Sequence, residues 1–103
     1  MIPSYDRARQ FGKTYVGALN TGTEAFAALF APDAAVSVGG AASDPQGVRD
    51  ATPPGRSGFR GARIEPPQVV LTVRVIDRAA QSVDDRPHRL TFDDQGRIAS
   101  LEA

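Results

Sequence analysis

The stretch QVVLTVRVI, residues 68–76, decides the fold class, because it is the strongest strand signal in the chain. Branched aliphatic side chains dominate it, as is typical of a strand that packs against a core. A second strand is predicted over residues 89–92. The run DDQG at residues 93–96 then has the composition of a hairpin turn, and residues 97–101 return as the last strand. The C-terminal part of the chain is therefore expected to be antiparallel β-structure.

The N-terminal part has the pattern of helices instead. Ser4 can cap a helix in which apolar residues recur at helical spacing as far as Leu19. The run Asn20-Thr21-Gly22 is a stop signal, since glycine suits the position after a helix. Thr23 can cap a second, shorter helix, which Pro32-Asp33 is expected to end.

The middle of the chain mixes short elements. Residues 34–38 alternate weakly and predict a strand. An acidic cap followed by proline predicts a short helix over residues 45–51, which Pro53-Pro54-Gly55 closes. Residues 52–61 are rich in glycine, proline and arginine and are expected to form a mobile loop. Helices followed by an antiparallel sheet predict a single α+β domain over residues 1–103.

Composition excludes several classes of function. The formal net charge is zero, which argues against a nucleic-acid binder. The chain has no cysteine and a single histidine, His88, so neither a thiolate site nor a multi-histidine metal site is expected, and no cofactor is predicted. No signal peptide is recognised, and the longest apolar stretch is too short to span a bilayer. The expected location is the cytoplasm, with no membrane partner.

Three patches together resemble the ketosteroid isomerase and SnoaL-like family. They are YVGALNTG (residues 15–22), ALFAPDAAV (28–36) and HRLTFDDQGRI (88–98). They are similar to the end of the family's first helix, its second helix running into a strand, and its final hairpin. The resemblance covers about residues 1–40 and 69–103, and the middle is shorter than in family members. It implies the nuclear transport factor two-like, cystatin-like cone fold, in which N-terminal helices pack on a curved, mostly antiparallel sheet around an apolar pocket.

The resemblance also implies roles for two residues. Tyr15 falls on the family's helix-one tyrosine, which donates a hydrogen bond to a substrate oxygen as negative charge develops there. His88, counted back from Phe92, falls where ketosteroid isomerases carry a protonated aspartic acid that binds the same oxygen. Both positions also suit packing, because Tyr15 lies on an apolar helix stripe and His88 shares a strand face with Leu90 and Phe92.

The surroundings of His88 decide the direction of its pKa shift. If His88 lines an apolar pocket, burial penalises the charged imidazolium and lowers its pKa. If it lies at the sheet edge near Asp84 and Asp85, those carboxylates raise its pKa.

Val38 departs from the family's pattern. Ketosteroid isomerases place the carboxylate base that moves the proton at this position, and valine cannot accept a proton. Ser37 is expected to point to the other face of the strand. A one-residue slip would not supply a base either, because no acid lies between Asp33 and Asp44. The family's proton shuttle is therefore expected to be absent.

The expected pocket is apolar and holds a hydrophobic small molecule. Its predicted substrate-binding residues are Val36, Val38, Leu71, Val73, Val75, Leu90, Phe92 and Leu101. With Tyr15 and His88 as catalytic residues, this predicts a SnoaL-like isomerase or cyclase that polarises an oxygen of a carbonyl-containing substrate. The alternative is a non-catalytic ligand-binding or dimerisation module, whose own side chains fill the pocket or hold a ligand without turning it over.

A homodimer is expected through the sheet. The outer face of the main strand carries Val70, Thr72 and Ile76, which is more apolar than a solvated face needs to be. A small domain gains stability by covering such a face, and two-fold pairing is the commonest way to do so. The resemblance implies the same arrangement, since family members dimerise through the sheet.

Overall fold

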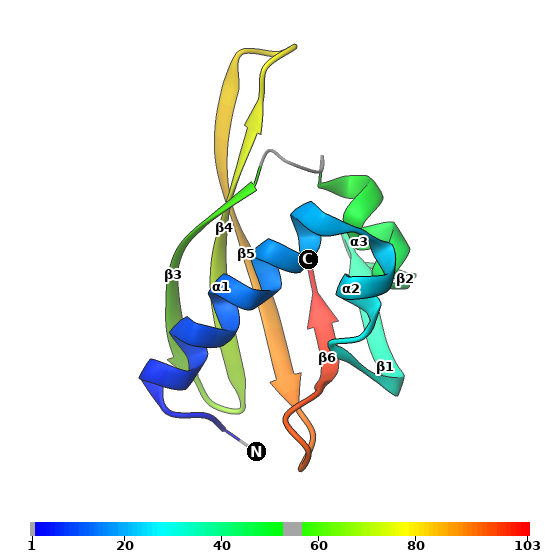
Figure 1. Ribbon diagram of the computed structural model, residues 1–103, viewed down its shortest axis with the longest axis vertical. Coiled ribbons are helices and arrows are strands. Elements are labelled where there is room, and N and C mark those ends of the chain that lie inside the picture. Colours follow the sequence, from blue (N-terminus) through cyan, green and yellow to red (C-terminus); the bar gives the residue numbers. More distant parts are fainter. Residues whose placement is uncertain (1, 53–56) are drawn as a thin grey trace.

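The computed structural model describes residues 2–52 and 57–103 of the chain. Within these residues, three helices pack on a six-stranded, curved, mostly antiparallel sheet, as the α+β prediction requires (Figure 1). The elements in chain order are α1 (Tyr5–Thr21), α2 (Thr23–Ala27), β1 (Phe30–Val38), β2 (Ala41–Ser43), α3 (Pro45–Ala51), β3 (Ser57–Glu65), β4 (Gln68–Asp77), β5 (Ser82–Phe92) and β6 (Ile98–Glu102).

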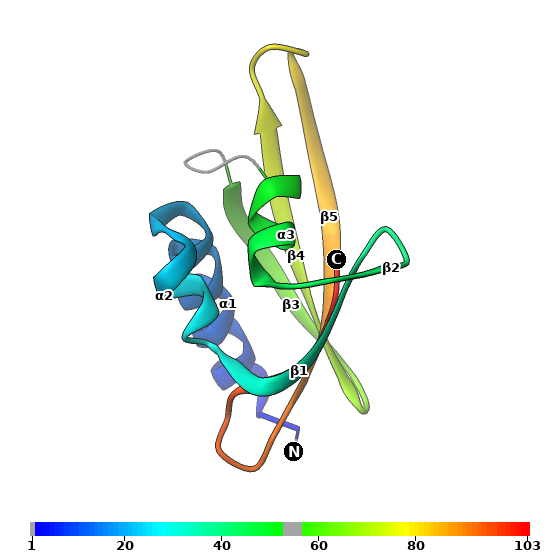
Figure 2. The same ribbon diagram turned by 90° about the vertical axis from the view of Figure 1, so that its right-hand side faces the viewer.

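The strand order across the sheet is β2-β1-β6-β5-β4-β3. Strands β1 and β6 pair in parallel, and the other neighbours are antiparallel. The β4–β5 ribbon continues past the point where Ser57 of β3 meets Val75 of β4, as far as the Asp77–Ser82 pair. Figures 1 and 2 show this ribbon rising beyond the body of the molecule, with α1 crossing the sheet and α2 and α3 lying over the β1 side.

Helix α1 forms as its sequence predicts. The Ser4 hydroxyl accepts the backbone N–H of Arg7, and the Gly22 N–H donates to the carbonyl of Ala18 at the other end. The face turned to the sheet is apolar, and Gly12 sits directly against the ring of Phe59 on β3. A Cβ at Gly12 would overlap that ring, so this glycine is what lets α1 lie close to β3.

The predicted end of the second helix is wrong. Helix α2 ends at Ala27, and β1 already begins at Phe30, whose ring packs edge-on against Phe26 at 5.1 Å between centroids. Pro32 lies inside β1 without ending it. It falls where the register with β6 shifts, between Phe30 and Ala35, so its missing N–H costs no ladder hydrogen bond.

Two further segments contain strand structure that the sequence does not predict. Part of the expected loop over residues 52–61 is strand, because β3 pairs with β4 from Ser57 onward, with a bulge between Phe59 and Gly61. The glycines and arginines of β3 interrupt the apolar–polar alternation by which a strand is recognised in a sequence. Residues 53–55, which are predicted to close the helix over residues 45–51, lie outside the described residues. Strand β5 begins at Ser82 instead of residue 89, since it pairs with β4 along its whole early length.

The outer face of the sheet is less apolar than predicted. Val70 is only 1% exposed and lies between its strand neighbours Arg63 and Arg89, whose guanidinium groups both pair with Glu65. Of the three residues expected on this face, Ile76 alone is a large exposed hydrophobic side chain.

Candidate functional site

Tyr15 of α1 and His88 of β5 meet in the interior of the cone. The Tyr15 hydroxyl oxygen lies 2.6 Å from Nδ1 of His88, and the two rings are nearly perpendicular. Tyr15 is 0% exposed and His88 1%. The helix stripe and the strand alternation each direct one side chain inward, so the fold brings together two residues 73 positions apart.

Burial keeps both groups neutral. Burial lowers the pKa of His88 from its ordinary value to about 4, with a smaller contribution from the charge of Arg86. Burial also raises the pKa of Tyr15 far above its ordinary value. The phenol therefore keeps its proton and the imidazole is uncharged, so the 2.6 Å contact is a hydrogen bond between two neutral groups, whose donor and acceptor roles follow the imidazole tautomer. The downward pKa shift matches the prediction for an apolar setting and not the one for a sheet edge.

Aromatic rings pack closely around this pair. Tyr15 meets the ring of Phe26 at 5.2 Å and that of Phe11 at 6.3 Å between centroids. Leu71, the strand neighbour of His88 on β4, is fully buried. His88 Nδ1 satisfies the Tyr15 hydroxyl, and these apolar side chains fill the space beside it.

The predicted substrate-binding residues do not share one open pocket. Those in the buried core cluster are Val36, Leu71, Val73, Val75, Leu90, Phe92 and Leu101, and Val38 packs against it. Tyr15, His88 and Leu71 line none of five surface pockets formed by the described residues. Val75 and Phe92 do line pockets, but at two different places.

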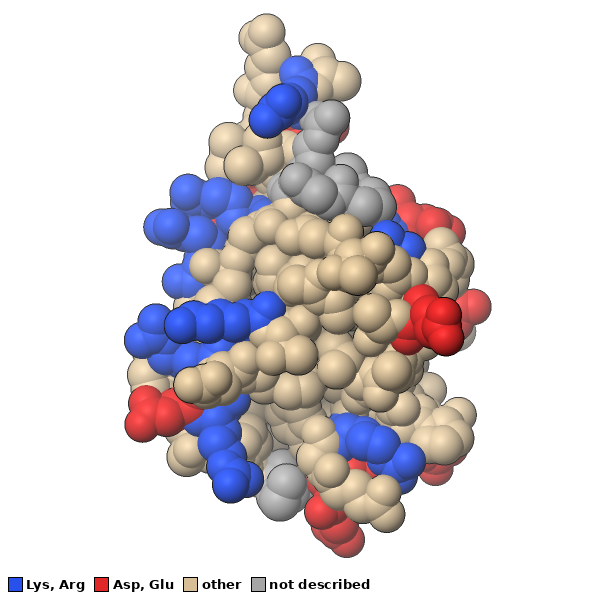
Figure 3. All heavy atoms as spheres, viewed as in Figure 1, with Lys and Arg blue, Asp and Glu red and all other residues tan. Residues whose placement is uncertain are grey.

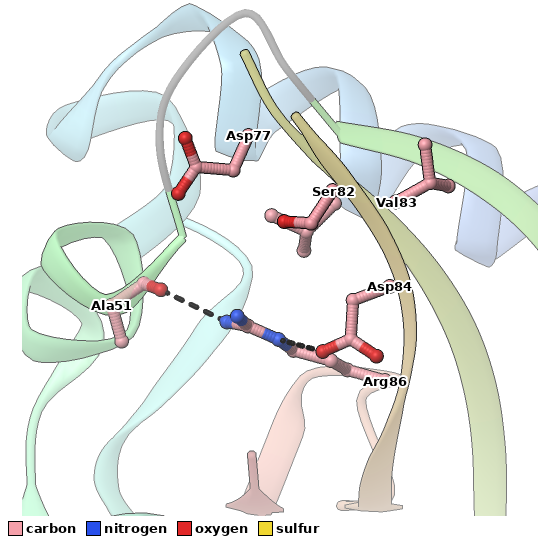
Figure 4. Close-up of a pocket in the computed structure, with 7 residues that line it drawn as sticks. Ala51, Asp77, Ser82, Val83, Asp84 and Arg86 are labelled. Carbon is pink, nitrogen blue, oxygen red and sulfur yellow. Dashed lines mark hydrogen bonds and ion pairs between the residues drawn. The ribbon is translucent and has the colours of Figure 1, made fainter. Parts of the chain in front are cut away.

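One of these pockets, which we call the mouth pocket, lies between the end of α3 and the β4–β5 ribbon (Figure 4). Its volume is about 420 Å³, and it is lined by Ala51, Val75, Asp77, Ser82, Val83, Asp84 and Arg86. Strand alternation puts Ser82, Asp84 and Arg86 on the same face of β5 as His88. The mouth pocket is thus the continuation of the concave face beyond the packed interior.

Arg86 separates the mouth pocket from the Tyr15–His88 pair. Its Nη1 donates to the Ala51 carbonyl at 3.1 Å, and its Nε lies 3.1 Å from a carboxylate oxygen of Asp84 (Figure 4). The first contact joins β5 to the C-terminal end of α3, where a cation is favoured by the helix dipole. Because Arg86 stands two residues from His88 on the same strand face, a ligand moving inward from the mouth pocket meets this guanidinium first.

The sequence pattern does not single out the polar residues of the mouth pocket. It predicts a strand that begins at residue 89, because Pro87 and the paired aspartates before it look like an irregular approach. A signal was present, since counting back from His88 in steps of two reaches Arg86, Asp84 and Ser82. These three residues pair with β4, so they belong to the same strand as His88 and the alternation applies to them.

Of the carboxylates that the structure describes, neither Asp44 nor Asp50 takes the place of the missing base. Val38 pairs with Ala41 of β2 and packs against the core. Asp44 caps α3 by accepting the N–H of Gly47 at 2.8 Å, and Asp50 accepts a hydrogen bond from the Gln46 side chain at 2.7 Å. Both acids therefore have partners on α3 itself.

The described residues, 2–52 and 57–103, contain neither a metal-binding cluster nor a membrane-spanning helix. No group of three or more histidine, aspartate or glutamate side chains there could hold a metal ion. No helix there combines the length and apolar character needed to cross a membrane.

Comparison with known proteins identifies the fold. No protein-family model and no curated protein matches the sequence. A de novo designed NTF2 fold protein superimposes with a TM-score of 0.72 at 15% identity, covering 100% of this chain and 87% of that one. A protein of unknown function with a cystatin-like fold from Methylobium petroleophilum PM1 gives 0.74 at 16% identity, with coverages of 99% and 77%.

A further match is a candidate polyketide cyclase from Sinorhizobium meliloti, with a TM-score of 0.67 at 24% identity and coverages of 86% and 88%. Identities this low establish the fold alone. The chain therefore has the NTF2-like, cystatin-like cone fold that its sequence resemblance implies, including the curved sheet.

Proposed function

We propose that this chain is a small-molecule-binding protein with the SnoaL-like fold that holds its ligand without turning it over. The observation that carries this proposal is the hydrogen bond between Tyr15 and His88. The two groups that would polarise a substrate oxygen satisfy each other inside a packed core, and Val38 supplies no base beside them.

The mouth pocket is the proposed ligand site. Val75 and Val83 offer apolar surface, while the other side of the pocket is polar and is lined by Asp77, Ser82, Asp84 and Arg86. Its volume of about 420 Å³ falls within the roughly 300 to 1,000 Å³ typical of small-molecule pockets. This combination favours a small molecule that joins an apolar part to a hydroxyl or carbonyl group.

Filling the mouth pocket tests this site. Ala51 is exposed at its rim, so Ala51→Phe should fold normally and occupy the space. With 2-naphthol as the probe, followed by its own fluorescence, we expect Ala51→Phe to remove binding. Ala27→Phe, at an exposed position at the end of α2, is the matched control and should bind as the wild type does. Equal binding by both variants would contradict the proposal.

Turnover is the second test. Without a positioned base, proton transfer loses a factor of about 10² to 10⁴, so we expect negligible isomerisation of an unsaturated ketosteroid. Val38→Asp should remain inactive, because Tyr15 and His88 are bonded to each other and sealed from ligand. Val38→Asn is the control for folding.

The second candidate function is a SnoaL-like isomerase or cyclase acting on a hydrophobic carbonyl compound. The convergence of Tyr15 and His88 from separate elements favours it, since the resemblance assigns both residues to one substrate oxygen. A substrate would have to displace Arg86 from the Ala51 carbonyl to reach them. Turnover by the wild type would favour this enzyme and contradict the non-catalytic proposal. Activity that appears in Val38→Asp but not in Val38→Asn would show that a ligand reaches Tyr15 and His88, which contradicts the sealed pair.

We also propose a homodimer. Ile76 and Val83 are strand partners on the rising ribbon and are 41% and 62% exposed. A second copy that covers them would remove an apolar pair from water.

A further inference from the structure

A second groove lies at the opposite end of the molecule from the ribbon tip, between the N-terminal half of α1 and the β5–β6 turn (Figure 1). We call it the α1 groove. Its volume is about 270 Å³, and it is lined by Pro3, Arg7, Gln10, Phe11, Thr14, Phe92 and Gly96. None of these residues lines the mouth pocket, so the two sites are separate.

The inner wall of the α1 groove is aromatic. Phe11 and Phe92 meet edge to face, with their ring centroids 4.9 Å apart. Phe11 is half-buried and stands between the groove and Tyr15, the next aromatic ring along the helix. With Pro3 opposite, this wall suits a flat apolar ring, because aromatic side chains stack and pack edge-on against such rings.

The rim of the α1 groove is polar and positively charged. Arg7, Gln10 and Thr14 follow one another at helical spacing on the face of α1 that also carries Phe11. Thr14 donates its hydroxyl to the Gln10 carbonyl. In the part of the chain that the structure describes, no carboxylate lines the groove, and the Arg7 guanidinium has no ion-pair partner.

The charge that marks the groove is that of Arg7 itself. Figure 3 shows basic side chains gathered along the edge of the molecule formed by β3 and the N-terminal half of α1, with acidic side chains at the lower end of the view as well as on the α2 and α3 side. The unpaired Arg7 guanidinium at the rim of the groove matches a carboxylate.

We propose that the α1 groove binds a small aromatic carboxylate. The aromatic ring lies against Phe11 and Phe92, and the carboxylate accepts hydrogen bonds from Arg7 at the rim. The volume of about 270 Å³ is close to the lower end of the usual range of roughly 300 to 1,000 Å³, which limits the ligand to one or two fused rings.

Titration of the full chain with 2-naphthoate tests this proposal, with heat and the backbone amide of Gly96 as readouts. Arg7→Gln should weaken binding about threefold to fivefold, the effect of losing one solvent-exposed charge pair. Arg9→Gln changes a neighbouring arginine that stacks on Tyr5 outside the groove, and it should leave the affinity unchanged. Thr14→Phe, at an exposed position, should fill the groove and abolish binding.

Three outcomes would overturn the proposal. Equal affinity for 2-naphthoate and neutral 2-naphthol, unaffected by Arg7→Gln, would leave no role for the charge. Undiminished binding by Thr14→Phe would place the ligand elsewhere. Loss of 2-naphthoate binding in Ala51→Phe, with Thr14→Phe unaffected, would move the ligand to the mouth pocket and support that site instead of the α1 groove.

Discussion

The hydroxyl of Tyr15 on the first helix is hydrogen-bonded to Nδ1 of His88 on the fifth strand, 73 residues later and fully inside the protein. A buried polar atom without a partner is costly, and here the Tyr15 hydroxyl and the His88 Nδ1 satisfy each other. The same pair that would bind an oxygen in an isomerase therefore forms a buried hydrogen bond that links α1 to the sheet.

Removing the hydroxyl should destabilise the protein. Tyr15→Phe leaves Nδ1 of His88 buried without its hydrogen-bond partner, and we expect a loss of about 1 to 3 kcal/mol in the free energy of unfolding. Urea denaturation measures it. Tyr5→Phe deletes the same atom from a ring that is 52% exposed and should change stability little. Equal losses in both variants would show that the buried hydrogen bond contributes nothing.

His88 should make stability depend on pH. Its pKa is lowered to about 4 in the folded state, whereas it is about 6.5 in an unfolded chain. Between these values the unfolded chain binds more protons, so stability is fully present above about pH 6.5 and falls as the pH drops towards 4, by up to about 3 kcal/mol.

His88→Asn isolates this contribution. The asparagine oxygen can still accept a hydrogen bond from Tyr15, but the side chain does not titrate. Urea denaturation of this variant between pH 4 and 6.5 should show a flatter profile than the wild type. Parallel profiles for the two proteins would mean that His88 is not held neutral by burial.

Two glycines of α1, Gly12 and Gly17, should respond oppositely to an added methyl group. Gly12→Ala places a Cβ against the Phe59 ring and should cost about 1 to 3 kcal/mol through overpacking. Gly17→Ala meets no atom within 4 Å and should stabilise the helix by up to about 1 kcal/mol. Thermal unfolding compares them, and a stabilised Gly12→Ala would contradict the close approach of α1 to β3.

The proposed dimer has a direct test. Sedimentation of the wild type at micromolar concentration should show a dimer, and Ile76→Lys with Val83→Lys should shift it to monomer. Ala79→Lys, at the exposed tip of the same ribbon, is the control for added charge. A monomeric wild type would count against pairing through this face.

The fold was largely predictable because its signals are local. The caps at Ser4 and Asp44 are confirmed, and the strand over residues 68–76 has the expected inward face. The errors fall where long-range pairing overrides composition. Pro32 lies in a strand held by β6, and β3 gains its strand structure from β4 despite its glycines.

The candidate site was only partly predictable. Alternation along β5 and the helix stripe indicate that His88 and Tyr15 point inward, but no pattern in the sequence says that they bond to each other. Whether a cavity remains beside them depends on how neighbouring rings such as Phe26 fill the interior, which is a property of packing in three dimensions. The Arg86–Ala51 contact likewise joins elements far apart in the chain.

An NMR titration of the His88 ring protons tests the central claim most directly, and the single histidine makes their assignment unambiguous. We expect a pKa well below the ordinary value, near 4, and ring resonances that do not move when saturating 2-naphthol is added at neutral pH. The ligand would then be bound outside a sealed Tyr15–His88 pair. A pKa at or above about 6.5, or ring resonances that shift with 2-naphthol in the wild type and in Ala51→Phe alike, would contradict it.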